Sequence, residues 1–139
     1  MKRNLFGALT ILVLALLVNV PVVNAQSKVK ADVPFAFTVA QSSLPDGTYT
    51  IRVVEGNEME IRNEQTNATV FLIAQHEESL KPQNPRLVFH RYGDKYFLAE
   101  AWCGSNAGIE IPASKLEQEM RAASSNSLPH AEEVVVALR

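Results

Sequence analysis

The sequence predicts a mainly β fold, a small antiparallel barrel or sandwich with one short helix in the C-terminal half. Apolar residues recur at every second position in several short segments, which is the period of a strand with one buried face. Glycine, proline and asparagine separate these segments at short intervals, and only residues 114–123 have the signals of a helix. Many short strands with one late helix favour a barrel or a sandwich.

The first 25 residues have the organisation of a secretory signal peptide. Lys2 and Arg3 precede an apolar run at residues 5–23, and small or short residues follow at the positions that signal peptidase reads. We expect cleavage between Ala25 and Gln26, which makes the mature protein secreted or periplasmic. The run is also about long enough to cross a ~30 Å hydrocarbon core, so the protein contacts the membrane only if this segment stays uncleaved.

Removal of the leader leaves 114 residues, enough for one domain with a single hydrophobic core. We expect an antiparallel β domain at residues 26–123 that includes the helix, and residues 124–139 as a linker followed by a closing strand or a tail. The mature domain has a formal charge of about −4, so nothing attracts it to nucleic acid. Cys103 is the only cysteine in the sequence, which excludes an internal disulfide.

The first half of the domain predicts a meander of strands. Residues 28–40 alternate in polarity, and Pro34 places this strand at a sheet edge or at a bulge because proline donates no ladder hydrogen bond. Further strands are expected from about Thr48 and over residues 58–63. The continuous apolar run within residues 68–75 indicates a strand that is buried on both faces.

Residues 87–102 predict a hairpin with a two-residue turn at Gly93 and Asp94. Both faces of this hairpin are apolar away from the turn and polar close to it, so we expect a buried base and a solvated tip. The register opposes Leu87 with Glu100 and gives one face with Leu87, Phe89, Arg91, Tyr96, Leu98, Glu100 and Trp102, and another with Val88, His90, Tyr92, Lys95, Phe97, Ala99 and Ala101.

Residues 114–123 predict a short amphipathic helix. Ser114 caps the free amides at its start, and Glu117 is placed to reach back to the Ser114 amide, as in a capping box. The narrow apolar stripe by which we expect this helix to pack consists of Leu116, Met120 and Ala123.

No group of residues has the spacing of a catalytic, metal or cofactor site. His76, His90 and His130 lack both the i, i+4 spacing and the clustering of zinc ligands, and no glycine-rich loop would cradle a phosphate. Cys103 ends an expected strand and is interpreted as a small buried hydrophobe. We therefore expect no metal, no cofactor and no enzymatic activity.

Three segments, VPFAFTVAQSSLPDGTYTIRVV, LVFHRYGDKYFLAEAW and IPASKLEQEM, resemble a family of small exported bacterial proteins without an established function. The most specific segment is the second, with the pattern LVFHRYGDxYFLxxxW; the first contains VPFxF and LPxGxYxI. The resemblance implies a β-rich envelope or secreted domain and supplies no catalytic residues.

The function that we expect is noncatalytic binding to, or assembly with, an envelope or extracellular partner. The candidate binding surface is the hairpin tip, which consists of His90, Arg91, Tyr92, Lys95 and Tyr96. One alternative is a carrier that holds a small apolar ligand inside a barrel, lined by Phe35, Phe37, Phe71, Phe89 and Trp102. Another is a small hydrolase that uses His90 and a neighbouring carboxylate.

Overall fold

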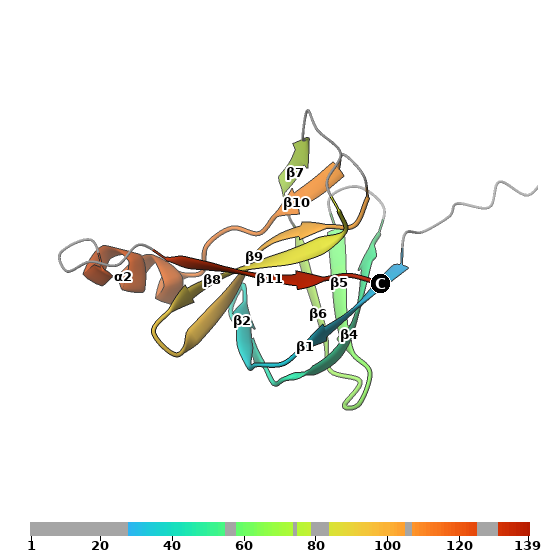
Figure 1. The fold of residues 1–139 in the computed structure, drawn as a ribbon, viewed down its shortest axis with the longest axis horizontal. Coiled ribbons are helices and arrows are strands. Elements are labelled where there is room, and N and C mark those ends of the chain that lie inside the picture. Colours follow the sequence, from blue (N-terminus) through green and yellow to red (C-terminus); the bar gives the residue numbers. More distant parts are fainter. Residues whose placement is uncertain (1–27, 55–57, 74, 79–83, 105–106, 125–130) are drawn as a thin grey trace, which may run out of the picture.

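Alternating apolar residues build two β-sheets around a shared core, with helix α2 (Lys115–Ser124) beside them (Figure 1). The computed structural model describes residues 28–54, 58–73, 75–78, 84–104, 107–124 and 131–139. The expected signal peptide and its cleavage site at Ala25 and Gln26 lie outside the described residues.

Four antiparallel strands form the first sheet in the order β1-β4-β5-β6. The strand expected at residues 28–40 is divided: β1 ends just before Pro34, and the chain then enters the second sheet as β2. This division fits the missing amide donor of proline, which cannot extend the ladder. The bounds are Lys28–Val33 for β1, Gly47–Val53 for β4, Glu58–Asn63 for β5 and Thr69–Ile73 for β6.

The second sheet has seven strands, five of which follow the order β11-β8-β9-β10-β7. β2 joins this sheet by a parallel pairing with β9, and β3 pairs with β2. The C-terminal segment is therefore a strand, β11, which pairs with β8. The bounds are Phe37–Val39 for β2, Ser42–Leu44 for β3, Gln75–Glu78 for β7, Arg86–Tyr92 for β8, Lys95–Trp102 for β9, Ala107–Glu110 for β10 and Glu132–Ala137 for β11.

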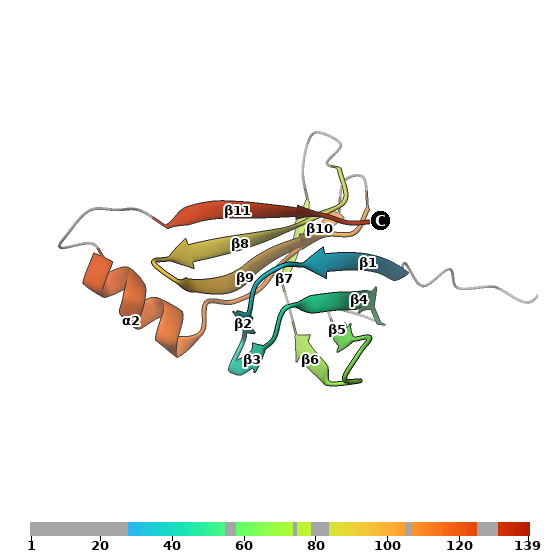
Figure 2. The ribbon, with the colours of Figure 1, turned by 60° about the horizontal axis from the view of Figure 1, so that its bottom comes forward.

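The two sheets form a sandwich and do not close into a barrel; Figure 2 shows β8, β9 and β11 in one layer and β1 and β4 to β6 in the other. An isolated bridge between Ala31 and Leu138 joins the layers at one side, where Lys30 and Arg139 exchange two backbone hydrogen bonds of 2.9 Å. The inner faces supply the core, whose largest fully buried side chains include Tyr49, Phe89, Ile51, Met59, Ile61 and Leu87.

The expectation that residues 68–75 are buried on both faces is wrong for β6. Val70 and Leu72 pack towards the core, whereas Phe71 and Ile73 are 59% and 81% exposed. Only the inner face of the four-stranded sheet packs against the core, as is common for antiparallel sheets. The outward residues of β6 therefore contact solvent although they are apolar.

The hairpin register follows the prediction near the turn and departs from it at the base. Phe89 faces Leu98 as expected, but Leu87 faces Ala101 and not Glu100. A β-bulge between Val88 and Phe89 shifts the pairing by one residue. Glu100 and Trp102 therefore lie on the opposite face from the one predicted, and Ala101 joins Leu87 in the core.

Helix α2, Lys115–Ser124, lies at the turn end of the β8–β9 hairpin (Figures 1 and 2). Its expected packing stripe is wrong: Leu116 is 44% exposed and Ala123 is exposed, whereas Glu117 is buried. The Ser114 hydroxyl accepts the Glu117 amide hydrogen at 3.1 Å, as the cap predicts. The Glu117 carboxylate does not complete the capping box, because it bonds to a side chain of β8 instead.

Candidate functional site

A tight turn positions the five candidate residues of the hairpin tip. Gly93 has a φ of 64°, the left-handed region that glycine enters without steric cost, so β8 reverses directly into β9. The pairs formed beside the turn are His90 with Phe97, Arg91 with Tyr96, and Tyr92 with Lys95. Because paired residues share a face, His90, Tyr92 and Lys95 lie on one side of the hairpin and Arg91 and Tyr96 on the other.

On the first side, α2 covers His90 through a buried carboxylate. The His90 Nδ1 atom lies 2.8 Å from Oε1 of Glu117, and the Glu117 side chain is only 3% exposed. Arg121 lies one turn further along α2, with Nη2 3.5 Å from the same oxygen. A buried carboxylate needs such partners, since its desolvation is otherwise costly. His90 therefore faces a packed neighbour.

Tyr92, which is buried at the end of β8, extends this network. The Arg121 Nε atom donates a hydrogen bond to the Tyr92 hydroxyl at 3.4 Å. This hydrogen bond, together with the nearby Glu117 carboxylate, raises the pKa of the Arg121 guanidinium. Arg121 thus stays charged and ties the helix to the hairpin at a second point.

On the second side, Arg91 and Tyr96 form a stacked arrangement. The Arg91 guanidinium lies 5.6 Å from the Tyr96 ring centroid, and that ring stacks on Phe35 at 3.9 Å. Arg91 also donates to the Gly93 carbonyl at 2.8 Å and to Glu132 of β11 at 3.2 Å. The Arg91 and Glu132 side chains are 41% and 65% exposed, so their ion pair contributes only about 0–1 kcal/mol and exchanges easily for another partner.

A groove of about 510 Å³ lies between the turn, α2 and the start of β11. We call it the tip groove. It combines charged groups at its rim with the apolar side chain of Met120, which is half-buried. Its lining residues are Arg91, Tyr92, Gly93, Asp94, Met120, Ser124 and Glu132. Two of the five predicted site residues, Arg91 and Tyr92, thus line one concave surface.

Sequence reasoning missed the partners that α2 and β11 bring to the tip. Glu117 is 27 positions from His90, and Glu132 is 41 positions from Arg91. No local pattern reports such a separation. The one available signal was the i, i+4 spacing of Glu117 and Arg121, which marks a charged helix face but does not show that the sheet covers it.

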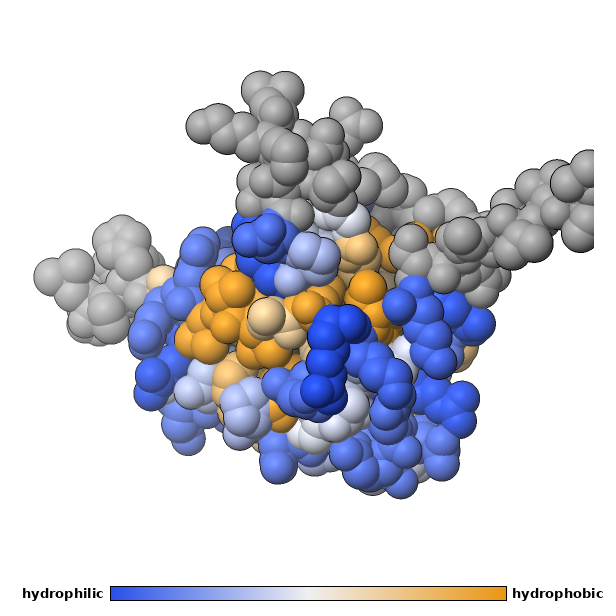
Figure 3. Space-filling view, turned by 45° about the vertical axis from the view of Figure 1, so that its right-hand side comes forward, coloured by the Kyte–Doolittle hydropathy of each residue, from blue (hydrophilic) through white to orange (hydrophobic). Residues whose placement is uncertain are grey.

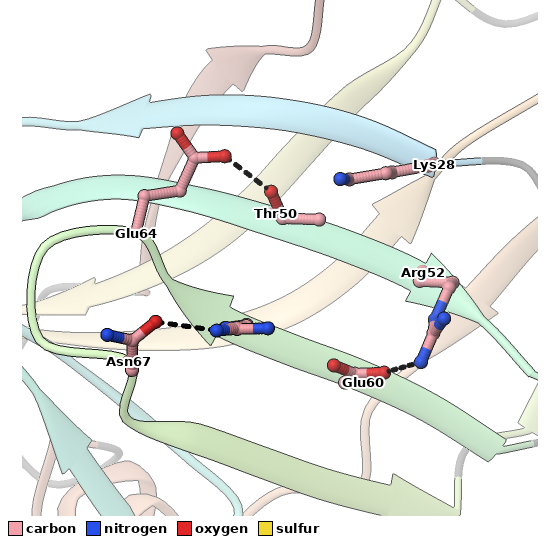
Figure 4. Close-up of a pocket in the computed structure, with 7 residues that line it drawn as sticks. Lys28, Thr50, Arg52, Glu60, Glu64 and Asn67 are labelled. Atoms are coloured by element: carbon pink, nitrogen blue, oxygen red, sulfur yellow. Dashed lines mark hydrogen bonds and ion pairs between the residues drawn. The ribbon is translucent and has the colours of Figure 1, made fainter.

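A second polar hollow, of about 380 Å³, lies on the outer face of β1, β4 and β5 (Figure 4). Its residues neutralise one another across the strands. Glu64 accepts a hydrogen bond from Thr50 at 2.8 Å and pairs with Lys30 at 2.7 Å, and these contacts lower the pKa of the Glu64 carboxyl. Arg52 pairs with Glu60 on the neighbouring strand. The hollow is thus bordered by ion pairs that are at least partly exposed, and such pairs are individually weak.

Of the five aromatic residues expected to line a carrier cavity, three pack together in the structure and two lie apart from them. Phe35, Phe37 and Phe89 pack edge to face within 5.2–5.3 Å between centroids and fill the interior. Phe71 is 59% exposed on β6. Trp102 is buried, but it lies on the face of β9 that is turned away from the core, where the Arg86 guanidinium is 5.4 Å from the centroid of the Trp102 ring.

The geometry around His90 also bears on the hydrolase alternative. His90 does have a neighbouring carboxylate, Glu117. A nucleophile activated by His90 would have to lie within hydrogen-bond reach of the ring. Among the described residues, Glu117 is the hydrogen-bond partner of the His90 ring.

Cys103 provides a test of burial at the end of β9. It is half-buried against the core, and desolvation raises the pKa of its thiol to about 11. We expect iodoacetamide to alkylate the folded Cys103 thiol roughly 100-fold more slowly at pH 8 than the thiol of the unfolded chain. The thiolate is the reacting form, and its fraction falls about tenfold for each unit by which the pKa rises. Because the folded thiol has the higher pKa, its contribution to stability is complete below about pH 9 and is lost as the pH rises towards 11. Equal alkylation rates in the folded and unfolded protein would contradict this.

Within the part of the chain that the structure describes, no three His, Cys, Asp or Glu residues group as a metal site would require. In the same part, no helix combines the length and hydrophobicity needed to cross a bilayer. No family model, curated protein or solved structure matches the chain.

Proposed function

We propose that this protein is an exported, noncatalytic β-sandwich domain that binds an envelope or extracellular partner protein at the tip groove. The observation that carries the proposal is the groove itself, a concave surface of about 510 Å³ in which Arg91 and Glu132 border the apolar Met120. Interfaces commonly combine an apolar centre with a charged rim in this way.

The charges at the tip suggest what the partner presents. The ion pair of Arg91 with Glu132 is exposed, and Lys95 lies exposed beside the turn. A carboxylate of the partner could replace Glu132 on Arg91 at little cost, because exposed ion pairs are weak. We therefore infer a partner segment with an acidic side chain next to an apolar one, the apolar side chain lying against Met120.

The test measures capture of partners from the secreted and periplasmic fractions by the immobilised mature chain. Arg91→Glu/Lys95→Glu is expected to reduce capture at least tenfold. Lys28→Glu/Arg62→Glu, which makes the same change in net charge at the polar hollow, should leave capture unchanged. Equal capture by wild type and by Arg91→Glu/Lys95→Glu overturns the proposed surface.

Charge reversal at Arg91 also disturbs the contact with β11, and a further variant separates the two effects. Arg91→Glu/Glu132→Arg restores an ion pair between β8 and β11 with its polarity inverted. We expect this variant to keep wild-type thermal stability and still to lose capture. Native mass spectrometry of the gently purified protein distinguishes the carrier alternative, which predicts an added ligand mass, whereas the proposal predicts a monomer or dimer of the chain without added mass.

A further inference from the structure

The edge strand β6 lacks the features that normally protect such strands from pairing with other chains. Among the described strands it pairs only with β5, so its other edge carries free backbone donors and acceptors. Its sequence, TVFLI, contains no charge, no proline and no glycine. Natural edge strands usually carry lysine, proline or a bulge at such places. β6 is therefore open to pairing with another strand.

β11, an outer strand of the second sheet, is protected by contrast. It begins with Glu132 and Glu133, and the chain just beyond it is held against β1 by the bridge of Leu138 with Ala31. β6 has neither device. Because of this difference, we expect β6 and not β11 to pair with another chain.

Two large apolar side chains lie beside the open edge. Phe71 and Ile73 are 59% and 81% exposed, and they face the same, outer side of the sheet because they are two residues apart. Their neighbours on β5 are Glu60 and Glu58. Figure 3 shows an apolar area on one face of the molecule, bordered in part by hydrophilic residues. On β6, however, the apolar side chains coincide with unpaired backbone.

We propose that β6 pairs antiparallel with β6 of a second copy of this chain, across a two-fold axis at Phe71. Antiparallel pairing of one strand with itself is self-complementary, so it forms a closed dimer and not a filament. Phe71 then faces Phe71 of the second copy, and Thr69 faces Ile73 of the second copy. This interface lies on the four-stranded sheet and is independent of the tip groove.

The charges around β6 are compatible with this pairing. β6 itself is uncharged, so no like charges are directly opposed across the joint. Arg62 pairs with Thr69, and Glu58 pairs with Ile73. The cross-strand row of side chains through the proposed interface is therefore Arg62 and Thr69 of one copy followed by Ile73 and Glu58 of the other. The charges at its two ends have opposite signs.

The size of the contact sets the strength of the dimer. Two paired five-residue strands bury less than the ~1,600 Å² typical of stable complexes, so the dimer belongs to the weak, reversible class. We expect a dissociation constant on the order of 10–100 µM. The protein is then monomeric when dilute and dimeric where it is concentrated.

Sedimentation equilibrium of the mature chain at concentrations from well below to well above this constant tests the inference. Wild type should convert from monomer to dimer, and Phe71→Lys should weaken dimerisation at least tenfold. Val135→Lys is the matched control, because Val135 is 55% exposed on β11, and it should dimerise as wild type does. Circular dichroism verifies folding; if Phe71→Lys does not fold, Ile73→Lys replaces it, since the Ile73 side chain is still more exposed.

Each contrary outcome overturns the proposal. A wild-type protein that stays monomeric throughout shows that β6 does not pair with itself. Open-ended oligomers exclude a closed two-fold dimer. A dimer that survives both Phe71→Lys and Ile73→Lys, or that Val135→Lys abolishes, places the interface elsewhere.

Discussion

Replacing Phe89 by alanine is expected to reduce the free energy of unfolding by about 3–5 kcal/mol, the usual cost of removing a buried phenylalanine. The Phe89 side chain is fully buried, and its ring packs edge to face on Phe35 at 5.2 Å and on Phe37 at 5.3 Å. The residue lies at the β-bulge of the hairpin, where β8 faces the core. Since small domains have only ~5–15 kcal/mol in total, this one change removes much of the stability.

Urea unfolding monitored by circular dichroism measures the effect. Phe71→Ala is the matched control, because it removes the same side chain from a site that is 59% exposed. At protein concentrations too low for dimerisation, Phe71→Ala should change the free energy of unfolding by less than about 1 kcal/mol. Similar losses for Phe89→Ala and Phe71→Ala would show that the hairpin base is not part of the core.

Glu117→Ala is expected to reduce the free energy of unfolding by about 1–3 kcal/mol and to loosen α2 from the sheet. The change removes the buried oxygen that contacts both His90 and Arg121. The estimate lies below the cost of breaking a fully buried pair because the His90 side chain is 25% exposed, so water partly replaces the lost partner.

Hydrogen exchange separates this local effect from global unfolding. The amides of α2 should exchange faster in Glu117→Ala, while those of β4 and β5 keep their protection relative to global stability. Glu119→Ala removes an exposed carboxylate from the same helix and should leave both stability and exchange unchanged. Unaltered exchange of α2 in Glu117→Ala would mean that the His90 contact does not hold the helix.

The features that the sequence predicted well are those set by neighbouring residues. Gly93 determines the turn and hence the pairing of Arg91 with Tyr96, and the alternating pattern predicts a mainly β fold. Barrel and sandwich could not be distinguished, because both use the same alternation. No glycine or proline at or beside Val88 and Phe89 indicates the bulge, so the predicted register at the base of the hairpin was wrong.

The errors in α2 and β6 share a cause, which is that burial depends on contacts distant in sequence. The sequence predicted Leu116 as a packing residue and Glu117 as part of a capping box. In the structure, Glu117 is instead buried because its carboxylate bonds to His90. The apolar run of β6 suggested two buried faces, whereas the outer face carries Phe71 in solvent. The polar residues of the tip were predicted together, but their partners Glu117 and Glu132 come from elements that periodicity cannot position.

The most direct test of partner binding at the tip groove is site-specific photo-crosslinking. A photoreactive amino acid replaces Lys95, which is exposed and directly follows the groove residue Asp94, and a matched variant carries it in place of Lys28 at the polar hollow. Both variants are illuminated with the secreted and periplasmic fractions, and crosslinked products are identified by mass spectrometry. We predict a defined crosslinked partner from position 95 and none from position 28. Crosslinks from position 28 with none from position 95 would contradict it.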